Sequence, residues 1–258
     1  MVMTIGDLAI DCADPEGLCC FYAAFTGWAK GELYGCPSLT AGNGLKILFM
    51  GCDSDYAPPV WPEKPGRQQK QVHLDFTVDD LPAALDRVLR LGAKRPAEQY
   101  GGEGFVTLLD LAGHPFCLCK RHLGNGFELY FRQRGFRSIP NPSINIDCPV
   151  SQNEGLRAFY AALTGWATDF HSAALIAGHG LVVHFMGCDF DYAPPVWPEE
   201  PGRQQKQMHF DLQVPDLPVA VEKALRLGAK RPAEQYGGED FVTLLDPVGH
   251  PFCLCKAE

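Results

Sequence analysis

The sequence predicts an α+β protein built from four βαβββ modules, and three observations support this prediction. The chain has 258 residues, about twice the length of a typical single domain. Its second half repeats its first: after a shift of 136 residues, 55 of the 70 residues in 51–120 are identical to those in 187–256. Within each copy, segments with the period of a strand alternate with segments with the period of a helix. We therefore expect two tandem domains with two modules each.

The repeat also sets the expected domain boundaries. Residues 1–120 form the first copy and residues 143–258 form the second. The stretch between them, 121–142, is interrupted by Gly and Arg and is the expected linker. The repeat does not say which modules pair with each other.

The first module begins with an alternating segment, GDLAIDC, which is typical of a half-buried strand. Asp14 is suited to cap a helix that has Pro15 in its first turn, and Gly27 is suited to end it. The apolar stripe of this helix is Leu18, Phe21, Tyr22 and Phe25. The same reasoning predicts four helices, near 15–26, 80–91, 153–164 and 216–227.

The second module of each copy begins with a strand and a helix and ends in a hairpin. In the first copy, HLDFTV alternates as a strand does, and FVTLLD and FCLC follow the helix. The joint Asp110-Leu111-Ala112-Gly113 has the residue preferences of a type I turn. We expect His114 and His250, which follow the two turns, to be exposed.

Charge and composition exclude several classes of partner. The formal net charge is −9 and no basic stripe occurs, which argues against nucleic acid. No apolar run approaches the roughly 18 residues of a membrane span, and the N-terminal segment lacks the features of a signal peptide. Eleven cysteines without a secretory signal predict free thiols in a reducing cytoplasm.

Several motifs resemble the vicinal oxygen chelate superfamily of glyoxalases, bleomycin-resistance proteins and dioxygenases. They are DCADPEGLCCFYAAFTGW at the start, HLDFTVDDLPAALDRVLRLGA in mid-domain, and the endings LLDLAGHPFCLC and LLDPVGHPFCLC. PPVWPE followed by QVHLDF is similar to the glyoxalase-like branch. The resemblance implies two tandem glyoxalase-like domains, each a pair of βαβββ modules that form a curved mixed sheet around a cavity, like a covalently fused dimer.

The resemblance also implies where a metal ion would bind in metal-dependent members, whose ligands are usually His or Gln, Glu, His and Glu. The four positions fall on Asp7 and Ser143, on Leu48 and His184, on His73 and His209, and on Cys117 and Cys253. Neither copy carries the full set. The second copy could assemble His184, His209 and Cys253, a set suited to zinc. The expected cofactor is therefore either none or one divalent metal ion.

Two histidine–aspartate pairs are candidate catalytic groups. His73 and Asp75, and likewise His209 and Asp211, are two residues apart on a predicted strand, so both side chains of a pair lie on the same face. Such a pair could orient an imidazole for proton transfer, or it could be a hydrogen-bonded wall of a pocket.

The loop 53–71 and its repeat 189–207 are rich in proline and long for a connection within a compact domain. Large, partly polar side chains on these loops are candidate ligand-binding residues. They are Tyr56, Trp61 and Arg67, with Tyr192, Trp197 and Arg203. The alternative is that the tryptophans clamp the loops onto the sheets.

The sequence therefore predicts a protein that binds a small organic ligand in one or both cavities, with or without isomerase- or lyase-type chemistry. The alternatives are a metal-free protein that sequesters a toxic compound and a non-catalytic interaction module. The chain is expected to be a monomer that resembles a dimer, or a homodimer.

Overall fold

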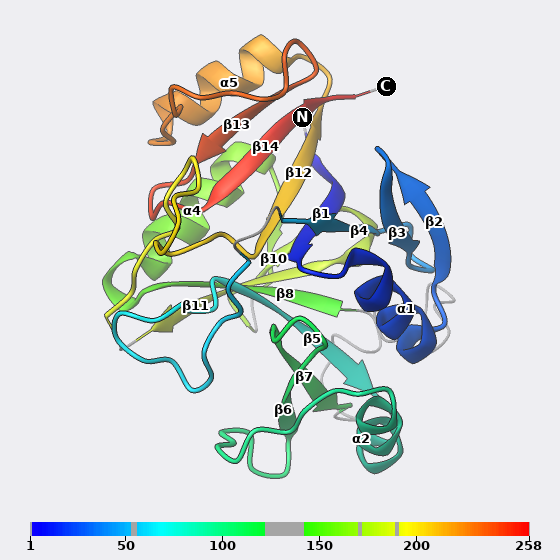
Figure 1. Cartoon of the computed structure of the whole chain (residues 1–258). Helices are drawn as coiled ribbons and strands as arrows, with labels where there is room; N and C mark the ends of the chain where they lie inside the picture. The colour runs from blue at the N-terminus through cyan, green and yellow to red at the C-terminus, as the bar shows by residue number, and fades with distance from the viewer. Residues whose placement is uncertain (1, 53–55, 122–141, 170–171, 189–190, 258) are drawn as a thin grey trace.

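A computed structural model describes residues 2–52, 56–121, 142–169, 172–188 and 191–257. Most of the expected linker, 122–141, therefore lies outside the described residues. The first copy consists of β1 (Thr4–Cys12), α1 (Pro15–Thr26), β2 (Ala29–Leu33), β3 (Cys36–Thr40), β4 (Lys46–Gly51), β5 (Val72–Val78), α2 (Leu81–Arg90), β6 (Phe105–Leu109) and β7 (Pro115–Lys120). All are labelled in Figure 1.

The second copy repeats this order. Its elements are β8 (Pro142–Pro149), α4 (Asn153–Thr164), β9 (Ala167–Thr168), β10 (Leu175–Ile176), β11 (Val182–Cys188), β12 (Met208–Val214), α5 (Leu217–Arg226), β13 (Phe241–Leu245) and β14 (Pro251–Lys256). The four helices agree with those expected from the sequence. In the second module of each copy, the strand after the helix is reduced to one bridge, Lys94 to Leu109 and Lys230 to Leu245. A proline two residues after each lysine cannot donate a ladder hydrogen bond, which explains the shortening.

Helix boundaries follow the capping residues expected from the sequence. The Asp14 side chain accepts a hydrogen bond from the Gly17 backbone N–H, 3.0 Å away, at the start of α1. Gly27 ends α1 in the left-handed conformation, with φ of 75°. The residues Leu18, Phe21, Tyr22 and Phe25 are buried, as the apolar stripe predicts. No helix of the described residues has both the length and the apolar character to cross a membrane.

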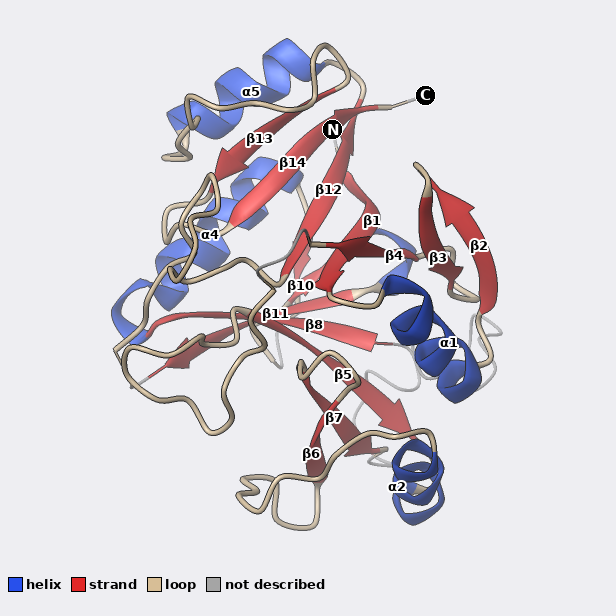
Figure 2. Ribbon diagram, in the orientation of Figure 1, coloured by secondary structure: helices blue, strands red, loops and turns tan. Residues whose placement is uncertain are grey.

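The strands form two seven-stranded mixed sheets (Figure 2). The first sheet has the order β13-β14-β12-β1-β4-β3-β2, and the second has the order β6-β7-β5-β8-β11-β10-β9. The α+β class, the tandem duplication and the curved mixed sheets are thus confirmed. The helices pack on one face of each sheet, and we call the opposite face the inner face.

Each sheet takes one module from each copy. In the first sheet, β1 of the first copy pairs antiparallel with β12 of the second, and in the second sheet β5 pairs antiparallel with β8. Both chain ends therefore belong to the first sheet and lie at the same end of the molecule (Figure 1). The loop between β4 and β5 carries the chain from the first sheet to the second, which is why the two copies interlock.

The core lies between helices and sheets. Leu8, Ile10 and Cys12 of β1 are fully buried against the helices, and Leu74 and Phe76 of β5 are buried in the same way. Strand alternation then places the neighbouring polar residues on the inner faces.

Candidate functional site

The inner face of the second sheet gathers five polar residues, which we call the second-sheet site. His73 and Asp75 of β5 lie on this face because Leu74 and Phe76 occupy the core face. Asn145 of β8 pairs with His73 on one side and with His184 of β11 on the other. Cys117 of β7 lies opposite Asp75. The site thus has residues from both copies.

The inner face of the first sheet carries the equivalent first-sheet site, made of Asp7, His209, Asp211 and Cys253. Asp211 of β12 is flanked by Asp7 on β1 and by Cys253 on β14. His209 pairs with Ala9, which in turn pairs with Leu48 on β4. The row that reads His73, Asn145, His184 in the second sheet therefore reads His209, Ala9, Leu48 in the first.

The expected metal set of His184, His209 and Cys253 is not brought together. His184 lies on β11 in the second sheet, whereas His209 and Cys253 lie in the first. The reason is that the modules pair between copies, so β11 joins the sheet that contains β5. His184 consequently shares a row with His73 of the first copy.

Two other groups of donor atoms do converge. In each group, one ligand atom from each residue lies within 4.8 Å of the others: His73 with Asp75 and Cys117, and His209 with Asp211 and Cys253. His73 Nε2 lies 3.6 Å from Asp75 Oδ1, and His209 Nε2 lies 3.7 Å from Asp211 Oδ1. Each pair shares a face, as its spacing predicts, at slightly more than hydrogen-bond distance.

The electrostatics of these groups follow from burial. Desolvation disfavours a charged imidazole and lowers the pKa of His73 well below 6.5, with Lys70 and His184 adding to the shift. Burial lowers the pKa of His209 in the same way. Both imidazoles are therefore neutral near pH 7 and could accept a proton or bind a metal ion.

The pKa values of the carboxyl and thiol groups shift upward instead. Burial raises the pKa of Asp75 to about 6, and burial together with the Asp211 carboxylate raises the pKa of Asp7 to about 8. Burial also raises the pKa of the Cys117 thiol to about 12 and that of Cys253 further. Both thiols are thus protonated at neutral pH.

Several buried polar atoms of both sites have no hydrogen-bond partner among the described residues. By strict geometry, in the second-sheet site they are His73 Nδ1, Asp75 Oδ1 and Asn145 Nδ2; in the first they are Asp7 Oδ1, His209 Nδ1 and Asp211 Oδ1. Asn145 and Cys117 nevertheless lie against the Asp75 carboxylate, and Asp7 lies against that of Asp211, so the histidine Nδ1 atoms are the groups left most clearly without a partner. An unpaired buried polar group costs about 1–3 kcal/mol. The Asp75 and Asp211 side chains remain 23% and 19% exposed, so both sites are open to solvent. Each site can therefore accept further hydrogen bonds.

The tyrosines of the two long loops are anchored to the hairpin turns. Tyr56 OH donates to the Ala112 carbonyl at 2.8 Å and lies 2.9 Å from His114 Nε2. Tyr192 OH lies 2.7 Å from His250 Nε2 and 2.9 Å from Gln71 Oε1. Tyr56 thus fixes its loop to its own copy, and Tyr192 fixes its loop to both copies.

The expectation that His114 and His250 are exposed is wrong. Both are buried, because the Asp110 carboxylate accepts the backbone N–H groups of Ala112 and His114 and turns His114 inward. Asp110 also accepts a hydrogen bond from Tyr22 OH at 2.8 Å. Asp246 binds His250 and Tyr160 in the same way.

The tryptophans cover two buried lysines. Lys70 Nζ lies 5.8 Å from the centre of the Trp61 ring, and Lys206 Nζ lies 5.5 Å from that of Trp197. The arginines Arg67 and Arg203 are exposed, and Arg203 pairs with Glu200 at 3.4 Å. These four residues lie on loops rather than on the strands that carry the two sites. Ligand binding by the six loop residues stays a prediction.

Sequence reasoning missed three kinds of residue around the sites. Lys70 contacts Asp147 at 2.5 Å and Glu63 at 3.1 Å, and Lys206 contacts Asp11 at 2.5 Å. Asn145 was missed because its repeat partner is Ala9. The lysines and their aspartates are identical in both copies, so the repeat could have indicated that these ion pairs form.

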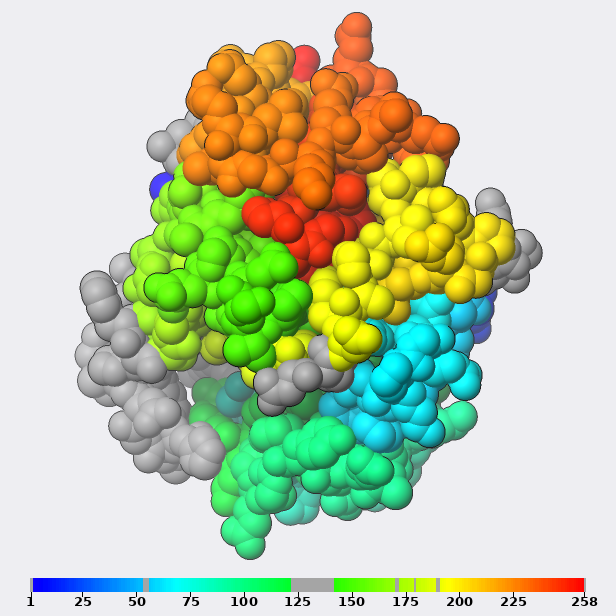
Figure 3. All heavy atoms as spheres, turned by 90° about the vertical axis from the view of Figure 1, so that its left-hand side faces the viewer, coloured from blue at the N-terminus to red at the C-terminus, as the bar shows by residue number. Residues whose placement is uncertain are grey.

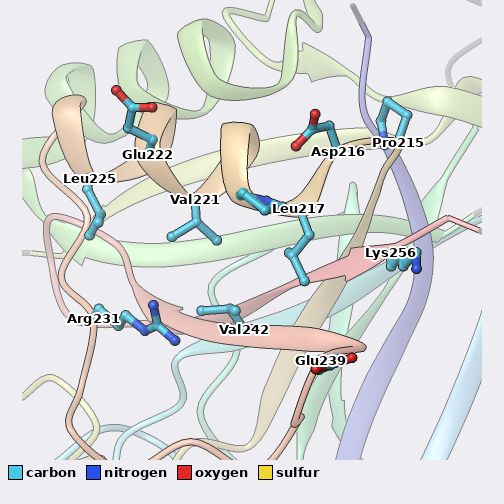
Figure 4. Close-up of a pocket in the computed structure, with 11 residues that line it drawn as sticks. Pro215, Asp216, Leu217, Val221, Glu222, Leu225, Arg231, Glu239, Val242 and Lys256 are labelled. Atoms are coloured by element: carbon cyan, nitrogen blue, oxygen red, sulfur yellow. The ribbon is translucent and has the colours of Figure 1, made fainter.

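A groove of about 700 Å³ lies away from both sites, between α5 and the hairpin of β13 and β14 (Figure 4). Its apolar floor includes Leu217, Val221 and Val242, and Asp216, Glu222 and Arg231 lie at its rim. None of the residues expected to bind a ligand or a metal lines it.

Paired modules of this topology, with polar inner faces, define a protein of the vicinal oxygen chelate class. More narrowly, the chain belongs to the family of the glyoxalase-like domain, whose family model matches residues 7–119 and 143–255. Together these ranges cover most of the chain, so the family assignment applies to both copies.

Solved structures support the fold. Glyoxalase I from Zea mays superposes with a TM-score of 0.59 at 14% identity, covering 98% of this chain and 92% of that one. A Bacillus subtilis protein provisionally described as a dioxygenase gives 0.57 at 12% identity, covering 99% and 85%. No curated protein matches the chain by sequence. At such identities the likeness shows the fold alone.

Proposed function

We propose that this protein binds a small organic molecule at both inner-face sites. The observation that carries the proposal is the convergence of buried, unpaired polar atoms in each site, at a place that stays open to solvent. Such atoms favour a ligand that supplies hydrogen-bond donors and acceptors on neighbouring carbons. The free state of all eleven cysteines favours a reducing compartment such as the cytoplasm.

The histidines are suited to proton transfer of the isomerase or lyase type. A neutral imidazole can take a proton from a carbon next to a carbonyl, and the nearby carboxyl group can hold the imidazole in one orientation. His73 and His209 are the proposed bases, and Asp75 and Asp211 the positioning residues. Sequestration without chemistry, or a purely structural role, remain the alternatives that the experiment separates.

The family includes metal-dependent members, and the donor sets fit a divalent ion in part. His73, Asp75 and Cys117, or His209, Asp211 and Cys253, would hold it, and a thiol with an imidazole and a carboxylate favours zinc. Such an ion would polarise a bound carbonyl oxygen. Donors around zinc lie about 3.3–3.8 Å apart, so the side chains would have to move inward.

The proposal is tested by NMR of protein labelled at the histidine ring, with glycolate and hydroxyacetone as probes. We expect saturable shifts of the His73 and His209 signals, identified by loss of each signal in His73→Ala and His209→Ala. Lys30→Ala is the matched control, since this exposed side chain on β2 pairs with Glu16 of α1, away from the inner-face sites, and should leave binding unchanged. Absence of saturable shifts at both histidines would contradict ligand binding.

Proton transfer has a separate readout in the same experiment. In D2O, abstraction by His73 or His209 exchanges the hydrogens beside the carbonyl of hydroxyacetone for deuterium. Binding without exchange above the buffer rate would favour sequestration over isomerase-type chemistry.

A further inference from the structure

The second copy contains a buried chain of hydrogen-bonding side chains that the proposed function does not use. His250 lies in the middle of this chain, with Nε2 2.7 Å from Tyr192 OH and Nδ1 3.1 Å from Asp246 Oδ2. An imidazole between a carboxylate and a hydroxyl can activate a nucleophile. Burial and the Asp246 carboxylate instead raise the pKa of Tyr192 far above 10, so its hydroxyl keeps its proton. The chain is therefore a candidate for a structural rather than a catalytic role.

The Asp246 end of the chain requires a proton on His250 Nδ1. Asp246 Oδ1 accepts from the backbone N–H groups of Val248 and His250, at 2.9 and 3.0 Å. Asp246 Oδ2 accepts from Tyr160 OH at 3.1 Å, and burial raises the pKa of Tyr160 well above 10, so this hydroxyl is a donor. A carboxylate that accepts from every other neighbour favours a donor at its fourth contact, which is His250 Nδ1.

The Tyr192 end requires a proton on the other ring nitrogen. Gln71 Nε2 donates to the Ala193 carbonyl at 3.1 Å, and this contact orients the amide so that Oε1 faces Tyr192 OH at 2.9 Å. An amide oxygen only accepts, so the single hydroxyl proton of Tyr192 goes to Gln71. The Tyr192 oxygen is then left to accept from His250 Nε2–H.

We propose that doubly protonated His250 is a pH-dependent latch that holds the loop 191–207 against the strand leading into the second-sheet site. Gln71 directly precedes β5 and lies two residues before His73. When the ring loses one proton, Tyr192 OH turns to the bare nitrogen and Gln71 Oε1 loses its donor. The latch therefore holds at lower pH and opens as the pH rises through the titration of His250. The inference concerns the attachment of the loop and does not depend on ligand binding.

The surroundings of His250 make it the group that can switch. Among the described residues, four titratable groups face the ring from the elements packed around it. They are Asp246 of the hairpin turn, Tyr160 of α4, Tyr192 of the loop and Asp147 of β8. The two tyrosines stay protonated, and Asp147 has its own cation in Lys70, 2.5 Å away. The carboxylate of Asp246 has no such lysine, so the imidazolium supplies its compensating charge.

The first copy provides a matched comparison within the same chain. His114 Nε2 lies 2.9 Å from Tyr56 OH, but this hydroxyl donates to the Ala112 carbonyl of its own hairpin. Gln207, the repeat counterpart of Gln71, is fully buried, and neither of its side-chain polar atoms has a partner in the described part of the chain. The latch thus reaches a strand of the other copy only through Tyr192.

The test follows two signals during one pH titration of the intact protein. NMR of the histidine ring nitrogens reports the protonation of His250, and hydrogen exchange corrected for the intrinsic rate reports the protection of the Ala193 N–H. We expect both nitrogens to be protonated while the loop is protected. As the pH is raised until the ring loses one proton, protection of Ala193 should fall at least about fivefold, because a buried acceptor loses its donor. The two signals should change together.

Two phenylalanine variants assign the effect to the hydroxyl. Tyr192→Phe should lower the protection of Ala193 at every pH and abolish its pH dependence. Tyr56→Phe is the control and should leave that dependence intact, since Tyr56 contacts its own copy. Thermal unfolding checks that both variants fold, and the titration of the unmodified chain decides the matter if Tyr192→Phe does not.

Three outcomes would overturn the latch. The first is a ring of His250 with only one protonated nitrogen while the loop is protected. The second is protection of Ala193 that does not change when the ring loses its proton. The third is a pH dependence that survives in Tyr192→Phe. Failure of glycolate and hydroxyacetone to bind would leave the latch standing, so the two proposals fail separately.

Discussion

At the scale of single residues, the most consequential groups are the buried lysines next to the sites. Lys70 comes three residues before His73, and its ammonium is surrounded by Asp147, Glu63 and the Trp61 ring. Its side chain is 11% exposed and that of Asp147 only 1%. Because Lys70 belongs to the first copy and Asp147 to the second, this buried ion pair ties the copies together where the second-sheet site begins.

Removing one partner of such a pair leaves the other charge buried without compensation. We expect Lys70→Met to lower the free energy of unfolding by about 3–5 kcal/mol in urea denaturation. Replacing Asp147 by Asn in the same chain should restore part of the loss. Lys30→Met is the control, since Lys30 and Glu16 form an exposed pair, and it should barely move the midpoint. Equal effects of the two lysines would contradict the burial argument.

At the scale of elements, the two long loops join the copies through hydrogen bonds to each other. Figure 3 shows the segments near 56–70 and 191–207 side by side on one face. Gln69 N–H donates to Gln204 Oε1 at 2.8 Å, and Gln205 N–H donates to Gln68 Oε1 at 2.9 Å. The Gln69 side chain also accepts from Ala193 N–H at 2.8 Å and donates to the Asp191 carbonyl at 2.7 Å. Glutamine side chains of each loop thus hydrogen-bond to backbone groups of the other loop.

Truncating Gln69 should therefore weaken the attachment of the opposite loop, not only the packing of one side chain. We expect Gln69→Ala to cost about 1–3 kcal/mol, because two backbone groups of the other copy lose their partner. Hydrogen exchange should speed up at Ala193, in the opposite loop. Arg67→Ala, in the same loop but exposed, should change stability by less than about 0.5 kcal/mol. Unchanged hydrogen exchange at Ala193 would show that the contact between the two loops does not depend on Gln69.

At the scale of the whole molecule, the chain behaves as a dimer fused into one polypeptide. Neither copy contains a complete sheet, since β1 needs β12 and β5 needs β8. The pairing places residues of both copies in each site. Function and stability should therefore depend on the association of the copies rather than on either copy alone.

Cutting the chain between the copies tests this directly. A specific protease site introduced into 122–141 should allow complete cleavage while the two fragments still elute together in size-exclusion chromatography. They should separate only in denaturant, because two antiparallel strand pairs and two buried ion clusters join them. Fragments that separate under native conditions would contradict the interlocked arrangement.

The sequence by itself determined the local structure of this protein. The period of the apolar residues and the glycines after the last turn fixed the four helices, and aspartate caps fixed the starts of α1, α2 and α5, because these signals act within a few residues. The internal repeat fixed the tandem architecture, and the spacing of His73 and Asp75 fixed their common face. Each of these features depends on interactions near in sequence or on identity between copies.

Only the tertiary structure decided which modules meet. Either pairing would bury the same apolar strand faces, so hydrophobic patterning cannot separate pairing within a copy from pairing between copies. That choice moved His184 away from His209 and Cys253 and placed it beside Asn145 and His73. It also buried Lys70 against Asp147, which lies in the other copy. The residues that the other copy adds to each site, such as Asn145 beside His73, were therefore set by contacts more than 70 residues apart in the chain.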